Sequence, residues 1–179
     1  MYLSKWISAT LAIVLLAGSA AAADTVSGGK VKTINADNKT FVLTDAANKD
    51  STFKFGDKVV INRGGTESKS DLKAGDAVSI CHDNGVLSST VHYILVREGF
   101  SKSSALVRGN VKGYDAGKKE LTFTDSNAKT WTFPMGKANV RLNMHDSKVG
   151  DIKIGDHALI IVDTIGTDAT LKSVMVDRK

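Results

Sequence analysis

The stretch DLKAGD at residues 71–76 returns almost unchanged as DIKIGD at residues 151–156. The two stretches lie 80 positions apart, and the same offset, carried without a gap over the 68 pairs from Gly29/Gly109 to Val96/Val176, gives 20 identities. Average residue usage would give roughly four. Because an internal repeat decides how every other residue is interpreted, we take the chain as a tandem duplication.

The repeated motif predicts a tight turn. An aspartate can accept backbone hydrogen bonds where a turn starts, and a glycine can take the positive φ that ends it. No other acid or base recurs beside the motif in both copies, so turn chemistry is favoured over catalysis by paired carboxylates. The residues of this structural turn are Asp71, Gly75, Asp76, Asp151, Gly155 and Asp156.

Each copy consists of short segments in which apolar and polar residues alternate between turn-forming residues, a pattern typical of β-strands in hairpins. In the first copy these segments include KVKTI (30–34), TFVLT (40–44) and STFKF (51–55). We expect five or six strands per copy. A copy of about 75 residues has a small core, and closing its sheet removes the exposed strand edges. The predicted fold class is all-β, with two tandem small antiparallel β-barrels.

The first 23 residues have the order of a secretory signal peptide: Lys5, the apolar run LAIVLLAG and the small residues SAAAA. The apolar run is shorter than the ~20 residues that cross a bilayer, so we expect cleavage after Ala23 and no transmembrane anchor. We divide the chain into a signal peptide (1–23), a first barrel repeat (24–97), a linker (98–104) and a second barrel repeat (105–179). The mature protein is expected to be periplasmic or secreted.

The chain holds 24 Lys and Arg against 19 Asp and Glu, a net charge of +5. The charges are scattered, as on a solvated surface. The histidines and aspartates show no spacing of a nucleophile and its base, and no glycine loop that would hold a phosphate. Nucleic-acid binding would require aromatic residues beside a basic groove. We therefore expect no enzyme activity, no catalytic residues, no cofactor and no nucleic-acid partner.

The strand G-x-V at 29–31 and 109–111, the segments TFVLTD and ELTFTD, and the turn D-L/I-K-x-G-D carry a resemblance. They resemble bacterial exported domains of unknown function that form small barrels similar to oligonucleotide/oligosaccharide-binding (OB) folds. The resemblance covers both repeats and implies an OB-like barrel in each, without catalytic residues. A remoter similarity is to periplasmic copper-binding barrels that use a Trp-Pro-x-Met-x-Met stretch and an upstream histidine.

The copper similarity rests on WTFPM at 131–135 and MH at 144–145. Thioether and imidazole ligands suit Cu(I), so Met144, His145 and Trp131 form a candidate metal site. Met135 aligns with Phe55 and is interpreted as a core residue. The chain departs from the copper family because no histidine stands just before Trp131 and no second methionine closely follows Met135.

Cys81, His82 and His92 form a second cluster of metal-ligating residue types. Successive strand residues point to opposite faces, and a zinc site needs three or four convergent ligands, so Cys81 is interpreted as a small apolar residue. If Val78 and Ile80 face inward, the outward positions of this strand and its repeat are unusually apolar. They predict an interface between the two barrels or a homodimer, in which a lone cysteine could bridge two chains. The candidate interface residues are Cys81, Leu159 and Ile161.

These features favour an exported, non-catalytic tandem β-barrel that binds a protein or polymer of the cell envelope. Surface loops of the second repeat are the expected contact region. The alternative is a periplasmic carrier of copper or another soft metal that uses the Met and His of the second repeat.

Overall fold

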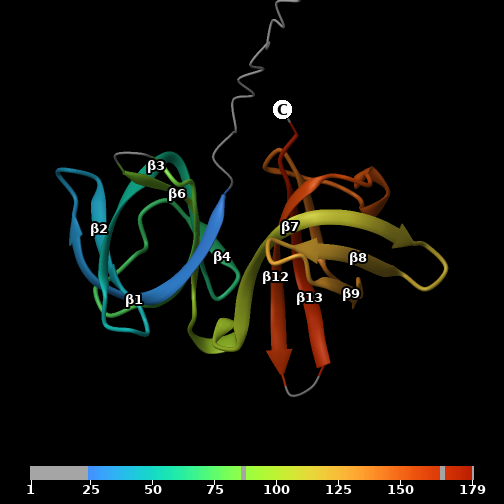
Figure 1. Cartoon of the computed structure of the whole chain (residues 1–179), viewed down its shortest axis with the longest axis horizontal. Helices are drawn as coiled ribbons and strands as arrows, with labels where there is room; N and C mark the ends of the chain where they lie inside the picture. Colours follow the sequence, from blue (N-terminus) through green and yellow to red (C-terminus); the bar gives the residue numbers. More distant parts are fainter. Residues whose placement is uncertain (1–23, 86–87, 166–167, 179) are drawn as a thin grey trace, which may run out of the picture.

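The computed structural model describes residues 24–85, 88–165 and 168–178, so the predicted signal peptide lies outside the described residues. The described chain is all-β, with two sheets that form two lobes side by side (Figure 1). Its only helices are the single turns η1 (Gly99–Ser101) and η2 (Val149–Asp151). Within these residues no helix has the length and hydrophobicity that a membrane crossing requires.

Lobe 1 is a closed five-stranded barrel. The sheet order is β2-β1-β5-β6-β3-β4. An additional pairing of β2 with β3 closes the barrel, and β4 pairs with β3 outside this ring of five strands. Strands β3 and β6 run parallel, so the barrel is mixed and the prediction of a purely antiparallel barrel is wrong. An alternating pattern is common to both strand directions and did not reveal this. The strands are β1 (Thr25–Asn35), β2 (Thr40–Thr44), β3 (Asp50–Arg63), β4 (Thr66–Ser68), β5 (Ala77–His82) and β6 (Ser89–Val96).

Lobe 2 is a seven-stranded sheet in the order β11-β10-β13-β12-β7-β8-β9, with β10 and β13 parallel. This sheet is not closed, so the prediction of a second closed barrel is wrong. The strands are β7 (Ser104–Asp115), β8 (Glu120–Asp125), β9 (Thr130–Pro134), β10 (Asn139–Leu142), β11 (His145–Asp146), β12 (His157–Ile165) and β13 (Asp168–Val176).

In lobe 2 a proline, Pro134, stands where Lys54 of lobe 1 is paired with Thr90 of β6. The N–H of Phe55 is donated to the strand on the β2 side, and the N–H of Met135 is donated to the corresponding β8 side. Because N–H groups alternate along a strand, the N–H of Lys54 points toward β6, and Pro134 has none to offer to β13. Gly136 then takes a φ of 46°, which ends β9. The long strand β3 is thus replaced by two short ones, β9 and β10.

Each lobe has its own hydrophobic core, made of alternate strand residues. Val78 and Ile80 are fully buried in lobe 1, which confirms the alternation predicted for β5. The core of lobe 1 contains Val31, Phe41, Leu43, Phe53, Val59, Ile61, Leu72, Val78, Ile80, Val91, Ile94 and Val96. The core of lobe 2 contains Val111, Leu121, Phe123, Phe133, Met135, Val140, Ala158, Ile160, Val162, Leu171, Val174 and Val176.

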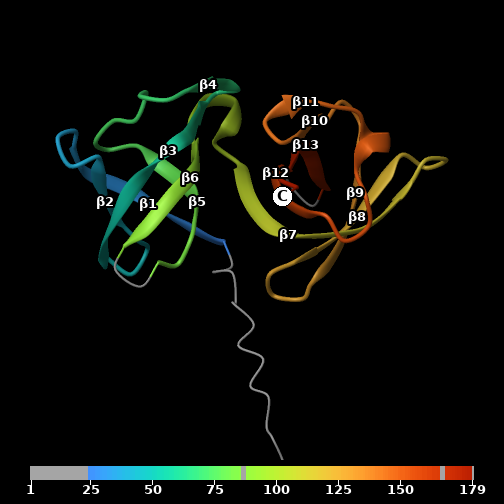
Figure 2. The same ribbon diagram turned by 90° about the horizontal axis from the view of Figure 1, so that it is seen from above.

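A third apolar cluster lies between the lobes, and we call it the interlobe cluster. Both lobes contribute the same face to it, since Cys81 and Leu95 of lobe 1 stand 80 positions before Ile161 and Met175 of lobe 2. The view from above shows β12, β13 and β7 of lobe 2 on the side toward lobe 1 (Figure 2). The cluster contains Val60, Cys81, Tyr93, Leu95, Leu106, Leu159 and Ile161, with Val26 and Met175 partly buried against it.

The hairpins β3–β4 and β10–β11 match each other with an offset of 79 instead of 80. Asn62 pairs with Glu67 in the first hairpin, and Arg141 pairs with Asp146 in the second. The gap-free alignment is therefore shifted by one residue in this region. Asn62 and Arg141 occupy corresponding positions, and so do the two hairpin turns, at residues 64–65 and 143–144, whose φ angles are all positive.

Candidate functional site

The repeated motif forms the same turn in both lobes. The carboxylates of Asp76 and Asp156 accept the backbone N–H three residues before them, at 2.8 and 2.6 Å. Gly75 and Gly155 have φ angles of 93° and 89°, which glycine adopts without strain. These contacts are all structural, and they hold the chain in place just before β5 and β12.

An arginine is bound to the motif in each lobe. Arg63, at the end of β3, donates to Asp71 at 2.8 Å and to Asp76 at 2.5 Å. In lobe 2 the arginine is Arg178, two residues after β13, and it donates to Asp156 at 2.6 Å and to the carbonyl of residue 151. The hydrogen bonds from Arg178 lower the pKa of Asp156 below its ordinary value. The motif is thus bound in both lobes by an arginine, which lies at the end of β3 in lobe 1 and after β13 in lobe 2.

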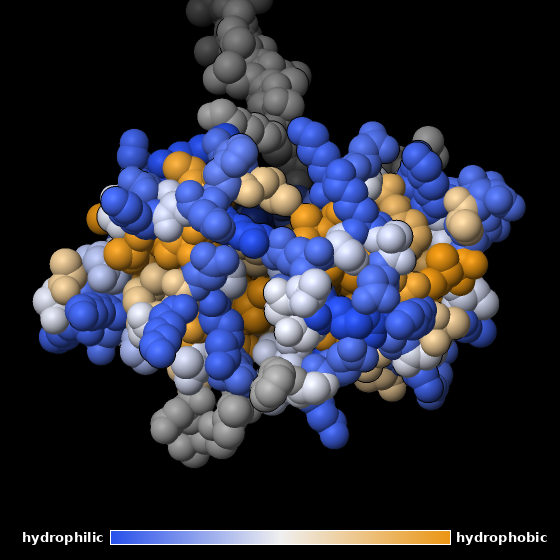
Figure 3. Space-filling model, turned by 180° about the vertical axis from the view of Figure 1, so that it is seen from behind, coloured by the Kyte–Doolittle hydropathy of each residue, from blue (hydrophilic) through white to orange (hydrophobic). Residues whose placement is uncertain are grey.

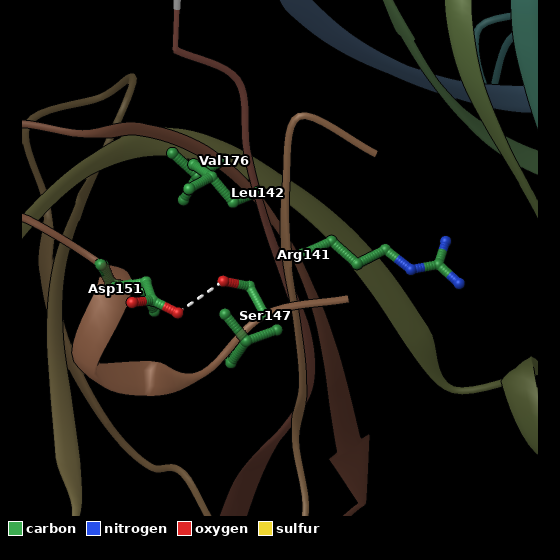
Figure 4. A pocket seen from close by; sticks show the side chains of 7 residues that line it. Arg141, Leu142, Ser147, Asp151 and Val176 are labelled. Carbon is green, nitrogen blue, oxygen red and sulfur yellow. Dashed lines mark hydrogen bonds between the residues drawn. The ribbon is translucent and has the colours of Figure 1, made fainter. Parts of the chain in front are cut away.

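The carboxylate of Asp151 has partners of its own. It accepts the hydroxyl of Ser147 at 2.7 Å and the N–H of Lys148 at 3.0 Å, and these bonds lower its pKa. Ser147 and Asp151 face each other at the rim of a dimple, while the side chain of Arg141 extends away from them (Figure 4). The volume of this dimple is close to 0 Å³, so it has no room for a ligand.

The structure places two of the three candidate copper ligands together. Met144 and His145 follow each other at the tip of the β10–β11 hairpin, and the Met144 side chain is 54% exposed. Trp131 lies on another hairpin, in β9, where its indole N–H donates to Asp125 at 2.9 Å and Lys129 Nζ stands 3.6 Å from its ring centroid. Among the described residues, His, Cys, Asp and Glu form no group of three or more that could hold a metal ion.

Cys81 and His82 are both buried, but on opposite sides of β5. Cys81 lies in the interlobe cluster, where burial raises the pKa of its thiol to about 12. His82 packs edge-on against Phe53 in lobe 1, with its ring nitrogens within hydrogen-bond distance of the Ser27 hydroxyl and the Asp83 carbonyl. The two residues point to opposite faces of β5, and both are buried because lobe 2 covers the outer face. His92 is half-exposed and lies 3.6 Å from the carboxylate of Asp83.

A cleft of about 270 Å³ lies between the lobes, and we call it the interlobe cleft. One wall is the β3–β4 hairpin of lobe 1, and the other is formed by β10 and β13 of lobe 2. Leu95 and Ile161, both buried in the interlobe cluster, form part of its lining. The remaining lining residues are Asn62, Gly64, Gly65, Glu67, Ser101, Ser104, Asn139, Arg141, Lys172 and Ser173.

A polar network crosses the cleft from one lobe to the other. The amide of Asn62 donates to the Tyr93 hydroxyl at 2.9 Å, and that hydroxyl donates to Glu67 at 3.3 Å. The other carboxylate oxygen of Glu67 accepts a hydrogen bond from Arg141 of lobe 2. Burial raises the pKa of Tyr93 above its ordinary value, so this hydroxyl stays protonated as a donor. The network therefore fixes the position of Arg141 within the cleft.

Two cationic side chains of the cleft walls lie close to carboxylates. The Nε–H of Arg141 is buried and makes no hydrogen bond to a described residue, with Asp146 at 3.5 Å. On β13, Lys172 lies 3.6 Å from the buried carboxylate of Asp163. The Nε–H groups of Arg97 and Arg108 are also buried without a hydrogen bond to a described residue, so this feature is not specific to the cleft.

Sequence reasoning did not find Asn62, Glu67, Tyr93 or Arg141. Each differs from the residue 80 positions away in the other copy, so a comparison based on shared residues passed over them. The available sequence signal is a glutamate in one hairpin and an arginine in the corresponding hairpin of the other copy. Only the assembled lobes bring these two residues together.

Hydrophilic side chains cover most of both lobes on the face shown in Figure 3, with hydrophobic ones between them in small patches. The exposed large hydrophobic side chains of the described chain are Ile34, Met144 and Ile154. Comparison of the sequence with models of protein families and with curated proteins finds no match.

Proposed function

We propose that the protein is an exported, non-catalytic binding module of the cell envelope, built from two repeated OB-like units, and that it binds its ligand in the interlobe cleft. The observation that carries this proposal is the cleft itself, in which lobe 1 supplies Asn62 and Glu67 and lobe 2 supplies Arg141. Small-molecule sites are concave, lie preferentially between domains and combine an apolar surface with a few convergent polar groups. The interlobe cleft has these three properties.

The OB-like part of the proposal is supported by the topology of lobe 1, in which β1, β2 and β3 form a meander and β3 runs parallel to β6. The duplication is supported by the offset of 80 positions between the starts of β2 and β8, β3 and β9, and β5 and β12. The lining residues of the cleft offer hydrogen bonds and charge, which suit the binding of a polar ligand.

The test is retention of small molecules by the protein. The whole protein is incubated with a low-molecular-mass extract of the cell envelope, separated from unbound compounds and analysed by native mass spectrometry. The variant Ser173→Tyr fills the cleft, and Thr170→Tyr places the same side chain at an exposed position of the same strand. We expect a bound mass with the wild type and with Thr170→Tyr, and none with Ser173→Tyr. Retention by all three proteins, or by none, would contradict the proposal.

The second candidate function is a carrier of Cu(I), favoured by the exposed thioether of Met144 next to His145. Two such donors suit Cu(I). Titration with Cu(I) under reducing conditions, followed by competition with a Cu(I) chelator, should show one bound ion that Met144→Ala/His145→Ala loses. Stoichiometric binding that survives in this variant, or no binding to the wild type, would remove the candidate.

A further inference from the structure

The size of the interlobe cleft limits its occupant. A volume of about 270 Å³ lies just below the range of roughly 300–1,000 Å³ for sites that hold drug-sized ligands. A single small ring with its substituents fits this space, whereas a longer polymer would have to extend outside it.

The charges of the cleft are already matched. Arg141 is paired with Glu67, and Lys172 is paired with Asp163. An anionic ligand would have to displace a carboxylate from one of these cations, and a cationic ligand would have to displace a cation from Glu67. Each exchange breaks one ion pair to form another, so charge alone gives little net affinity. A neutral ligand leaves both pairs intact.

The pairs nevertheless have hydrogen-bonding capacity to spare. The guanidinium of Arg141 has N–H groups besides the one bonded to Glu67, and each carboxylate oxygen of Glu67 accepts only one described bond. A hydroxyl group both donates and accepts, so one hydroxyl can accept from Arg141 and donate to Glu67. The lining also contains the amides of Asn62 and Asn139 and the hydroxyls of three serines. Bonds from a hydroxyl to charged groups are the stronger kind, which favours a ligand with several hydroxyls.

The apolar part of the lining completes the description. Leu95 is 1% exposed and Ile161 is 6% exposed, and both reach the cleft from the interlobe cluster. These two side chains leave little surface for a ligand, so its contacts would come mainly from the polar lining residues.

We propose that the interlobe cleft binds a neutral polyhydroxylated ligand the size of one sugar unit, whose hydroxyls bridge Arg141 and Glu67. This inference rests on the proposed function, because it names the ligand class of the same site.

The test is isothermal titration calorimetry of the whole protein with neutral and anionic probes. The neutral probes are glucose, galactose and N-acetylglucosamine, and the anionic probes are inorganic phosphate and citrate. Glu67→Gln keeps the shape of the side chain and removes its charge. Asp50→Asn is the matched control, since it removes the carboxylate of an exposed ion pair with Lys32 outside the cleft.

We expect at least one neutral sugar to bind, with an affinity that Glu67→Gln weakens by about tenfold or more and Asp50→Asn leaves within about twofold. Ser173→Tyr, which leaves Glu67 unchanged, should abolish binding and guards against a folding defect in Glu67→Gln. Binding of the anions alone, sugar binding that is unchanged in Glu67→Gln and Ser173→Tyr, or no binding of any probe would overturn the inference. The mass-spectrometric test judges the proposed function separately, because a retained compound of another class preserves the site and rejects only the sugar.

Discussion

Replacement of Leu95 by alanine should lower the stability of both lobes, although Leu95 belongs only to lobe 1. Its side chain is 1% exposed and packs in the interlobe cluster with Leu159 and Ile161 of lobe 2. Truncation of a buried leucine costs about 3 kcal/mol on average. With a denaturant dependence of about 2 kcal/mol per molar urea, the unfolding midpoint should fall by about 1.5 M.

The assay uses protein without residues 1–23, in which Trp131 is the only tryptophan. Trp131 packs against the core of lobe 2, so its fluorescence reports unfolding of that lobe. His92→Ala is the control, since its half-exposed side chain lies on the same strand and its removal should change stability by about 0.5 kcal/mol or less. If the Trp131 transition of Leu95→Ala coincides with that of the wild type, the lobes are independent and the reasoning about a shared core fails.

Three further outcomes follow from individual contacts. Asp156→Asn should cost about 1–3 kcal/mol at pH 7, because it breaks the hydrogen bonds with Arg178. Since the pKa of Asp156 is lowered in the folded state, this contribution is complete above the ordinary value of 3.8 and is lost as the pH falls through the lower, folded pKa. The stabilities of the two proteins, measured by urea titration between pH 2 and 7, should therefore converge at the acid end. A constant difference in stability would contradict the assignment. The thiol of Cys81, whose pKa burial raises to about 12, should react with a thiol reagent at pH 8 only upon unfolding, and rapid labelling of the native protein would refute its placement between the lobes. Pro134→Lys should supply the missing N–H toward β13 and slow amide exchange near Leu171, with a gain of about 0.5–1.5 kcal/mol, whereas unchanged exchange would show that another feature keeps the sheet open.

The repeated motif made much of the architecture predictable. Alternation placed Val78 and Ile80 in the core, and the alignment of Met135 with Phe55 marked the methionine as a core residue, both as observed. These properties are local, since a strand pattern and a turn depend on residues close in sequence. The same reasoning could not foresee the open second sheet, because the pairing of β9 with β13 depends on residues far apart in the sequence.

The alignment without gaps also failed in one region. Lobe 2 has one residue fewer between β9 and β10, so the comparison placed Met144 opposite Gly64, whereas strand pairing places it opposite Gly65. An insertion and a compensating deletion leave the overall offset at 80 and are invisible in a plain count of identities. Only the hydrogen-bonded register reveals them.

The interlobe cleft depends on tertiary structure alone. Glu67 and Arg141 are 74 positions apart and belong to hairpins that the sequence presents as separate turns. Their pairing arises because the two lobes pack through the same face, which brings one hairpin of each to the same rim. Sequence patterns describe the faces of single strands and contain no statement about which lobes meet.

The measurement that tests the interlobe cleft most directly is a map of amide chemical shifts of the isotope-labelled protein on addition of the low-molecular-mass envelope extract. We expect the largest changes on the lining, at Gly64, Gly65, Ser101 and Ser173, with little change at the exposed hairpin tip of Met144. Changes confined to that tip or to the β2–β3 side of lobe 1, or a spectrum that the extract leaves unaltered, would contradict binding in the interlobe cleft.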